Sequence, residues 1–116
     1  MTLACAGAWQ SPAQAGRLAT LTGVADEQQV VVEQHFKLAE QANITVGHVV
    51  TARDRGCRVR VRIYRQLPNG NWSVVNTPVQ VSGSSRGRQN ILLPAGEYRV
   101  EVTARHASFT VTIDKD

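Results

Sequence analysis

The basic residues of this chain are almost all arginines, and many of them fall in one segment. Only Lys37 and Lys115 among the 13 Lys and Arg residues are lysine, and the formal net charge is +4. A guanidinium pairs with carboxylate or phosphate through two parallel hydrogen bonds, and it costs less to desolvate than an ammonium, so arginine is common in interfaces. A GC-rich coding bias would also favour arginine. The dense segment holds Arg53, Arg55, Arg58, Arg60, Arg62 and Arg65.

Three of these arginines have a spacing that predicts a geometry. Arg58, Arg60 and Arg62 alternate with apolar residues, so in a strand they form a row on one face with a repeat of about 6 to 7 Å. Like charges in such a row repel, and they need solvent, an acidic cross-strand neighbour such as Glu101, or an acidic partner. A solvated face, a protein interface and nucleic acid remain open. Nucleic acid is disfavoured, because single-strand binding needs aromatic side chains among the cations and this face offers only Tyr64.

Two further partner-binding candidates lie near the N-terminus. Trp9 is the one large side chain of that segment, and a tryptophan on an arm often fills a pocket of a partner chain. The alternative is that Trp9 folds back on the core of its own domain. Arg17, in the same segment, is the second candidate contact.

The sequence carries no arrangement of side chains that is typical of catalysis. His35, His48 and His106 lie on three separate segments, whereas a structural zinc site needs about four convergent ligands. Neither a G-x-S-x-G nucleophile elbow nor a phosphate-binding glycine loop occurs. We therefore expect a protein that is not an enzyme and that holds no metal and no cofactor.

Apolar residues at alternate positions predict strands along most of the chain. The clearest strand covers 57–67 and precedes Asn69-Gly70, a strong signal for a two-residue hairpin. Turn residues recur about every 10 positions, so we predict an all-β, antiparallel, jelly-roll-like sandwich of about eight strands. A helix is the alternative at 30–38, because Gln, Glu and Lys favour helices. Further strands are expected at 30–38, 44–51, 72–75, 79–81, 98–105 and 109–113, with a break at 76–78 and a loop at 82–88.

The first 28 residues differ in texture from the rest, being rich in Ala, Gly, Gln and Thr without a sustained pattern. We expect an extended N-terminal arm at 1–28, with a peripheral first strand at 17–22 as the alternative, and a sandwich domain at 29–116. The start of the chain lacks the positive residues and long apolar run of a secretion signal. No segment reaches the roughly 20 apolar residues of a membrane span. Cys5 and Cys57 permit one disulfide, but we expect Cys57 to be a free, buried thiol.

The order of segments resembles a known group of domains. A strand leading into LAEQANITV, a central VRVRIYRQLPNGNWSVV and a final ILLPAGEYRVEVTA…SFTVTI are similar to the jelly-roll modules of the bacterial pre-peptidase C-terminal type, in which a similar Gly-(Glu/Thr)-Tyr turn precedes the penultimate strand. The resemblance covers about residues 33–114 and implies a fold rather than a function. Those modules accompany secreted enzymes, whereas this chain has no enzyme, no signal segment and no acidic calcium-ligand cluster. In architecture and size the chain also resembles small decoration or cement proteins of tailed-phage capsids, and phage tail accessory proteins.

These observations lead to one main hypothesis and two alternatives. The main one is a structural virion protein that forms a homo-oligomer, such as a trimer, and decorates a larger shell such as a major capsid protein, with the arm as a clamp. The first alternative is a secreted or appended, non-catalytic module that binds glycan or protein. The second is a nucleic-acid binder, whose affinity would fall steeply with salt.

Overall fold

The computed structural model describes residues 16–116, and all regular structure in this part of the chain is β-strand. A helix long and apolar enough to cross a membrane is absent from these residues. The eight strands are β2 (Arg17–Ala25), β3 (Val30–Leu38), β4 (Ala42–Ala52), β5 (Arg58–Gln66), β6 (Trp72–Val81), β7 (Ser85–Leu93), β8 (Gly96–Arg105) and β9 (Ala107–Lys115).

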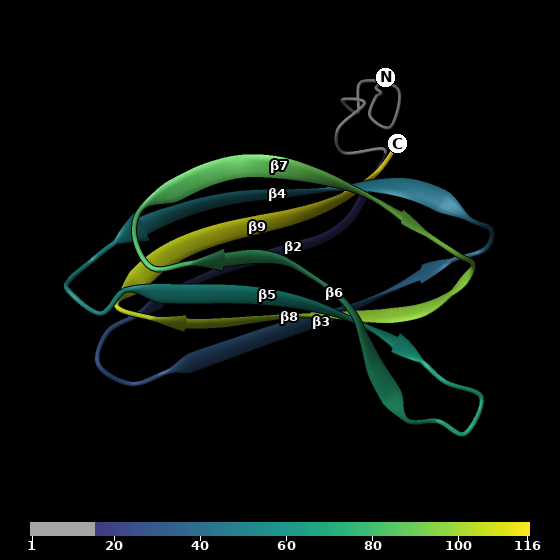
Figure 1. The fold of residues 1–116 in the computed structure, drawn as a ribbon, viewed down its shortest axis with the longest axis horizontal. Helices are drawn as coiled ribbons and strands as arrows, with labels where there is room; N and C mark the ends of the chain where they lie inside the picture. The colour runs from purple at the N-terminus through teal and green to yellow at the C-terminus, as the bar shows by residue number, and fades with distance from the viewer. Residues whose placement is uncertain (1–15) are drawn as a thin grey trace, which may run out of the picture.

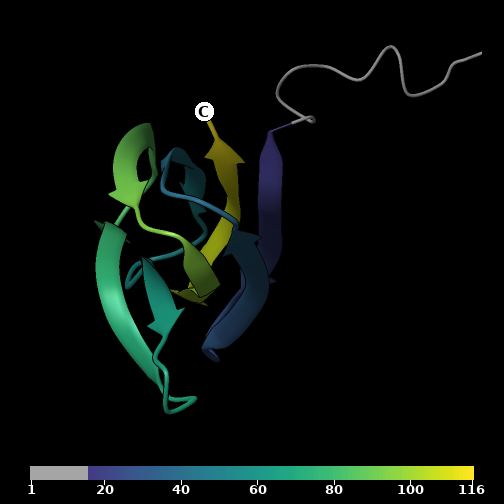
Figure 2. The same cartoon turned by 90° about the vertical axis from the view of Figure 1, so that its right-hand side faces the viewer.

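The strands form two four-stranded antiparallel sheets (Figure 1). One sheet has the order β2-β9-β4-β7 and the other has the order β3-β8-β5-β6. Only β5 and β6 are neighbours in both sequence and sheet, and every other connection crosses from one sheet to the other. The first and last of these strands therefore pair with each other, and Figure 2 shows β2 in purple beside β9 in yellow. This is the topology of a jelly roll, so the predicted fold class is confirmed.

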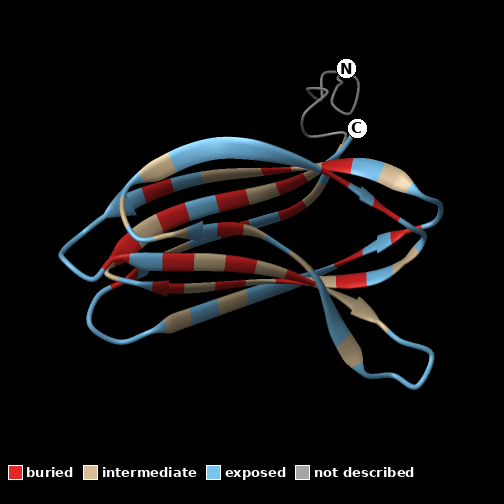
Figure 3. Ribbon diagram, in the orientation of Figure 1, coloured by how far each residue is buried: buried red, intermediate tan, exposed pale blue. Residues whose placement is uncertain are grey.

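The core lies between the sheets and is apolar throughout. Figure 3 shows buried bands alternating with mostly intermediate bands along the central strands, because successive strand residues point to opposite faces. Val61 of β5 and Val102 of β8 have no exposed surface, and Ile113 of β9 has none either. Among the described residues no polar or charged side chain is buried. Burial of apolar surface therefore stabilises this fold, and any binding chemistry must lie on its outside.

The two flanks of the sandwich differ. On one flank β2 contacts β3, so the sheets close against each other. On the other flank β7 is an edge strand, and its residues Gly87 and Gln89 are exposed although they share the inward side with buried Ile91 and Leu93. The sandwich is therefore open along β7.

Two details of the strand prediction were wrong. The expected break at 76–78 lies inside β6, which continues to Val81 with two shifts of register against β5. Pro78 is tolerated there because β6 is an edge strand with bulges, where a missing backbone N–H costs little. The expected loop at 82–88 is too long, since β7 begins at Ser85. Nine consecutive pairings with β4 supply the backbone partners that this polar, glycine-containing stretch needs.

The expected arm at 1–28 does not hold for β2. Arg17–Ala25 pair along β9, and Ala19, Leu21 and Ala25 are buried in the core. The alternative of a peripheral first strand is what the structure shows here, because every second residue of this stretch is apolar or small enough to face the core. Residues 1–15, which include Trp9 and Cys5, lie outside the described part of the chain.

The Pro94-Ala95-Gly96 turn is held by the tyrosine that follows it. The Tyr98 hydroxyl donates a hydrogen bond to the Pro94 carbonyl oxygen at 2.6 Å, and its ring stacks on Phe36 with centroids 5.3 Å apart. Burial raises the pKa of Tyr98, an effect that the positive charge of Arg65 partly offsets. The turn-and-tyrosine pattern in the sequence therefore marks a structural tie between the sheets' ends rather than a ligand site.

Candidate binding site: an arginine groove on one sheet

The arginine row lies on the outer face of the sheet β3-β8-β5-β6, as its alternation with apolar residues predicted. Arg58 is exposed and Arg60 and Arg62 are half-buried, while the residues between them face the core. Strand β8 fixes the neighbours of the row on one side. The cross-strand pairs are Arg58 with Arg105, Arg60 with Thr103, and Arg62 with Glu101.

A groove of about 810 Å³ crosses one end of this outer face. It receives residues from β8, β5 and β6, and from Gln29 just before β3. None of the residues that line it is Asp or Glu. We call it the arginine groove and define it by its three guanidinium groups and the polar side chains around them: Arg58, Arg60, Arg105, Gln29, Gln80 and His106.

The positive charges of the arginine groove have no carboxylate partner within the described residues. The ion pairs of residues 16–116 involve Arg17, Arg53 and Arg99, and none of the groove arginines. Arg58 and Arg105 stand directly opposite each other on neighbouring strands, an arrangement that destabilises a sheet. The Nε atom of Arg60 is buried without a hydrogen-bond acceptor, which is costly for a charged group. An anion in the groove would relieve both costs.

The rim of the groove is fixed by backbone hydrogen bonds at His106. This residue makes the turn between β8 and β9 with a φ of 52°, a left-handed conformation that is uncommon outside glycine. Its N–H donates to the Asp26 carbonyl oxygen at 3.0 Å, and its own carbonyl oxygen accepts from the Arg53 N–H at 2.9 Å. The side chain of Asp26 pairs with Arg53 at 2.9 Å. The carboxylate of Asp26, in the loop before β3, is therefore already occupied.

The remaining candidates from the sequence are not in the groove. Arg62 lies on the same face but faces Glu101 and does not line the groove. Arg17 pairs with Asp114 and also donates to the Thr20 hydroxyl at 3.1 Å, so its charge is compensated within the fold. Trp9 is outside the described residues.

A second cluster on the same outer face combines aromatic rings with a cation. The Arg99 guanidinium carbon lies 4.4 Å from the centroid of the Tyr64 ring and 5.3 Å from that of Trp72. His35 meets Trp72 edge-on with centroids 5.3 Å apart. Arg99 also lies 3.7 Å from Glu33. We call His35, Tyr64, Trp72 and Arg99 the aromatic cluster; the sequence had indicated only Tyr64 on this face.

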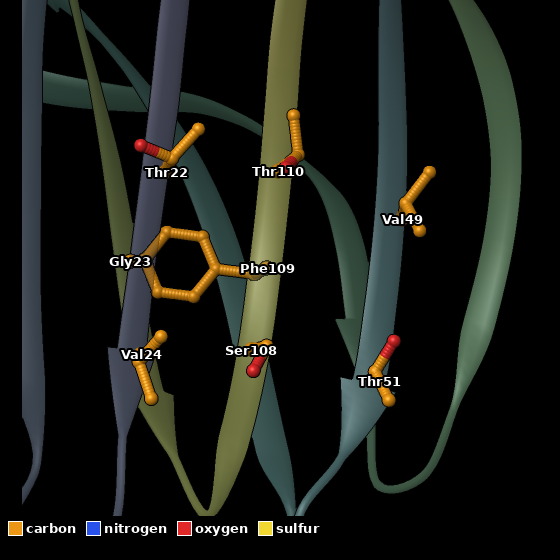
Figure 4. A pocket seen from close by; sticks show the side chains of 8 residues that line it. All are labelled: Thr22, Gly23, Val24, Val49, Thr51, Ser108, Phe109 and Thr110. Atoms are coloured by element: carbon orange, nitrogen blue, oxygen red, sulfur yellow. The ribbon is translucent and has the colours of Figure 1, made fainter.

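The outer face of the other sheet has a different character. Figure 4 shows a shallow depression of about 370 Å³ on this face, lined by residues near the end of β2, the end of β4 and the start of β9. Phe109 points inward beneath Gly23, where an added Cβ would lie 2.7 Å from the ring. Hydroxyl and valine side chains surround the depression, and Arg86 and Arg88 stand beyond it on the edge strand β7. We call this surface the threonine face and define it by Thr22, Val24, Val49, Thr51, Ser108 and Thr110.

Burial shifts the pKa of two further groups, Cys57 and His48. Burial raises the pKa of the Cys57 thiol, and Cys57 is buried and unpaired among the described residues, so its thiolate is scarce near neutral pH. Burial lowers the pKa of His48, whose Nε2 lies 2.9 Å from the Ser85 hydroxyl. In residues 16–116 no group of three or more His, Cys, Asp and Glu side chains is placed to hold a metal ion.

Sequence reasoning missed part of the site. The alternation of apolar residues at 98–105 puts Arg105 on the outer side of its strand, but the sequence does not reveal that this strand pairs with β5 and so brings Arg105 opposite Arg58. Nothing in the sequence around Gln29 or Gln80 singles out either glutamine as a binding residue. Trp72 could not be placed by counting through the hairpin, because a two-residue turn at Asn69-Gly70 would put it opposite Leu67, whereas it pairs with Gln66 on the outer face.

The chain was compared with known proteins. No protein-family model matches the sequence, and no curated protein is similar to it. Solved structures do match. A protein from Sulfurospirillum deleyianum has a TM-score of 0.60 and 9% identity over 84% of this chain and 96% of that one. The pre-peptidase C-terminal domain of collagenase from Bacillus anthracis has a TM-score of 0.60 and 14% identity over 85% and 90%.

A viral protein shares the fold less closely. The VP2 protein of infectious bursal disease virus has a TM-score of 0.51 and 12% identity, covering 84% of this chain and 31% of the viral one. What these proteins share with the chain is the fold. The resemblance to pre-peptidase C-terminal modules therefore holds at the level of the β-sandwich, and function rests on the site.

Proposed function

We propose that this chain is a non-catalytic β-sandwich subunit that docks through the arginine groove on an acidic surface of a larger protein assembly. The observation that carries the proposal is the convergence of Arg58, Arg60 and Arg105 without a carboxylate from the described chain. Three uncompensated guanidinium groups lower the stability of the free sheet, so they make physical sense where a partner supplies the negative charge.

In its most specific form, the assembly is a virus shell that the chain decorates as a cement subunit, located in the virion. A jelly roll without a catalytic motif, and the fold shared with VP2, support this form by analogy of architecture. In this form the chain is a homo-oligomer, such as a trimer, and residues 1–15 with Trp9 reach a neighbouring subunit or the shell protein.

Light scattering behind size exclusion tests the assembly part of the proposal. The full chain and a chain that begins at Gly16 are compared, because a start at Gln29 would remove β2 from the core. We expect a closed oligomer for the full chain and a monomer for the shortened one. A full chain that stays monomeric at all concentrations would contradict self-assembly and leave only docking on a larger partner.

Binding to acidic polymers tests the docking part. Poly-L-glutamate and single-stranded DNA of similar charge are titrated into the full chain at increasing salt concentration. We expect poly-L-glutamate to bind more tightly than DNA, because guanidinium forks match carboxylates and none of the residues that line the groove is Phe, Tyr or Trp, on which bases could stack. DNA that binds better, with a steep loss of affinity in salt, would favour the nucleic-acid alternative.

The aromatic cluster supports a second candidate function, a glycan-binding module. Trp72 and Tyr64 lie on one face with His35 and Arg99, and such rings offer apolar surface together with polar edges. A glycan array probed with the full chain and with Trp72→Ala tests it. Binding that the substitution abolishes would support this function, whereas an array without any hit would count against it.

A further inference from the structure

We infer that the arginine groove takes a short, extended, acidic peptide segment, with Arg60 as its inner anchor. The inference rests on the proposed docking function and makes it specific: the ligand is a single strand of about four residues rather than a broad acidic surface. Its basis is the shape of the groove, the placement of the three guanidinium groups and the amide side chains at its two ends.

The groove has the length of a short extended peptide. It runs across the sheet from Gln29, beside β3, to Gln80 on β6. Four neighbouring strands span three spacings of about 4.8 Å, or roughly 14 Å, and an extended chain advances about 3.4 Å per residue. About four residues therefore fill it. A volume of 810 Å³ is also far more than one inorganic anion occupies.

The three arginines are spaced for separate carboxylates. Arg58 and Arg60 are two residues apart on β5, which places them about 6.6 Å apart, and Arg105 lies on the adjacent strand opposite Arg58. Along the path from Gln29 to Gln80, Arg105 and Arg58 come first, on neighbouring strands, and Arg60 comes next, opposite Gln80. A peptide that crosses the strands can therefore place one acidic side chain between Arg58 and Arg105 and a second one beside Arg60.

Arg60 is the anchor because its Nε already lacks a partner. This atom is buried without an acceptor among the described residues, whereas Arg58 and Arg105 are exposed. The carboxamides of Gln29 and Gln80 each offer a donor and an acceptor, which suits the backbone C=O and N–H groups of a peptide. The other arginine pair, Arg86 and Arg88 on β7, borders a smaller depression of about 400 Å³.

Calorimetric titration of the full chain with acetyl-tetraglutamate-amide tests the inference. The variant Arg60→Gln should weaken binding about tenfold or more, because a hydrogen bond between charged groups is lost. The variant Arg62→Gln is the matched control: it removes the same charge from the same strand and face, two residues away and outside the groove. We expect it to change the affinity by no more than about threefold.

The outcomes separate this inference from the proposed function. If long poly-L-glutamate binds and the tetrapeptide does not, acidic docking stands and the short-peptide groove is wrong. If neither binds, both are wrong. Equal losses in Arg60→Gln and Arg62→Gln would overturn the groove as the site. A sulfated tetrasaccharide that binds more tightly than the peptide, with the same loss in Arg60→Gln, would overturn the peptide in favour of an acidic glycan.

Discussion

The outer faces of the two sheets carry different kinds of side chain, although both arise from the same alternation of inward and outward residues. The threonine face is built from short hydroxyl and β-branched side chains. The charges of this sheet lie at its borders, where Arg17 pairs with Asp114 and where Arg86 and Arg88 line the edge strand β7. The opposite face carries the arginine groove, whose charges have no such partner among the described residues. Both sheets contribute apolar residues to the core between them. The comparison teaches that the inner positions specify the fold, whereas the outer positions of the two sheets are free to differ in charge.

The comparison implies that the sheet behind the threonine face serves the fold. Its side chains have high strand propensity and few rotamers to lose. The sheet that carries the arginine groove is destabilised by the repulsion between Arg58 and Arg105 on its outer face. Four predictions break or sharpen this contrast.

The largest effect should follow from removing β2. A chain that begins at Gln29 loses the buried residues Ala19, Leu21 and Ala25 and exposes the edge of β9. Truncating one buried leucine alone costs about 2–5 kcal/mol, within a total stability of about 5–15 kcal/mol for a typical domain. We expect this chain not to fold, whereas a chain that begins at Gly16 folds. Circular dichroism and thermal unfolding of the two chains test this expectation. Cooperative unfolding of the chain that begins at Gln29 would contradict the role of β2.

The next effect comes from the packing beneath the threonine face. In Gly23→Ala the new Cβ would lie 2.7 Å from Cζ of Phe109, in a ring that is buried beneath the strand (Figure 4). Overpacking of this kind costs about 1–3 kcal/mol. Urea unfolding measures the loss, and Gly83→Ala serves as the control because nothing lies near its added Cβ. Equal stability of the two variants would show that Phe109 moves aside freely.

A smaller effect, of opposite sign, is expected on the arginine face. Arg105→Gln removes one of two like charges that stand opposite each other, so the unfolding free energy should rise by about 0.2–1 kcal/mol. The same change should weaken binding of acidic peptide. Urea unfolding and peptide titration of one preparation measure both quantities. A variant that is less stable than the parent chain would mean that Arg105 has a structural partner.

The smallest effect concerns pH. Burial lowers the pKa of His48 from its ordinary value of 6.5, so between the two values the unfolded chain binds the proton and the folded chain does not. The stability therefore falls as the pH drops through 6.5 and is unaffected well above it. We expect His48→Gln to show a weaker loss of stability below pH 6.5 than the parent chain. Parallel pH profiles of the two unfolding free energies would contradict this account.

Much of the fold could be predicted from the sequence, because alternation is a local property. The strand at Val30–Leu38 was predicted with the observed bounds, and the Asn69-Gly70 hairpin joins β5 to β6, with a φ of 89° at Gly70. The first residues of β7, 85–88, were expected in a loop, because their polar, glycine-containing sequence is extended only through pairing with β4, a long-range contact. Local pattern cannot reveal such a partner.

The candidate site was predictable only in part for the same reason. The row of Arg58, Arg60 and Arg62 follows from spacing within one strand. Arg58 and Arg60 line the groove and Arg62 does not. This difference depends on strand β8, which places Arg105 opposite Arg58 and Glu101 opposite Arg62. Sheet order, rather than residue type, decides which charges meet.

The most direct test of the central claim is amide chemical-shift mapping of the full, ¹⁵N-labelled chain with acetyl-tetraglutamate-amide. The account predicts that the largest changes cluster at the arginine groove, around Arg58, Arg60, Gln80 and Arg105, and that Thr22 and Thr110 on the threonine face do not respond. Changes that centre on the threonine face or on its bordering Arg86 and Arg88, or the absence of any saturable change, would contradict it.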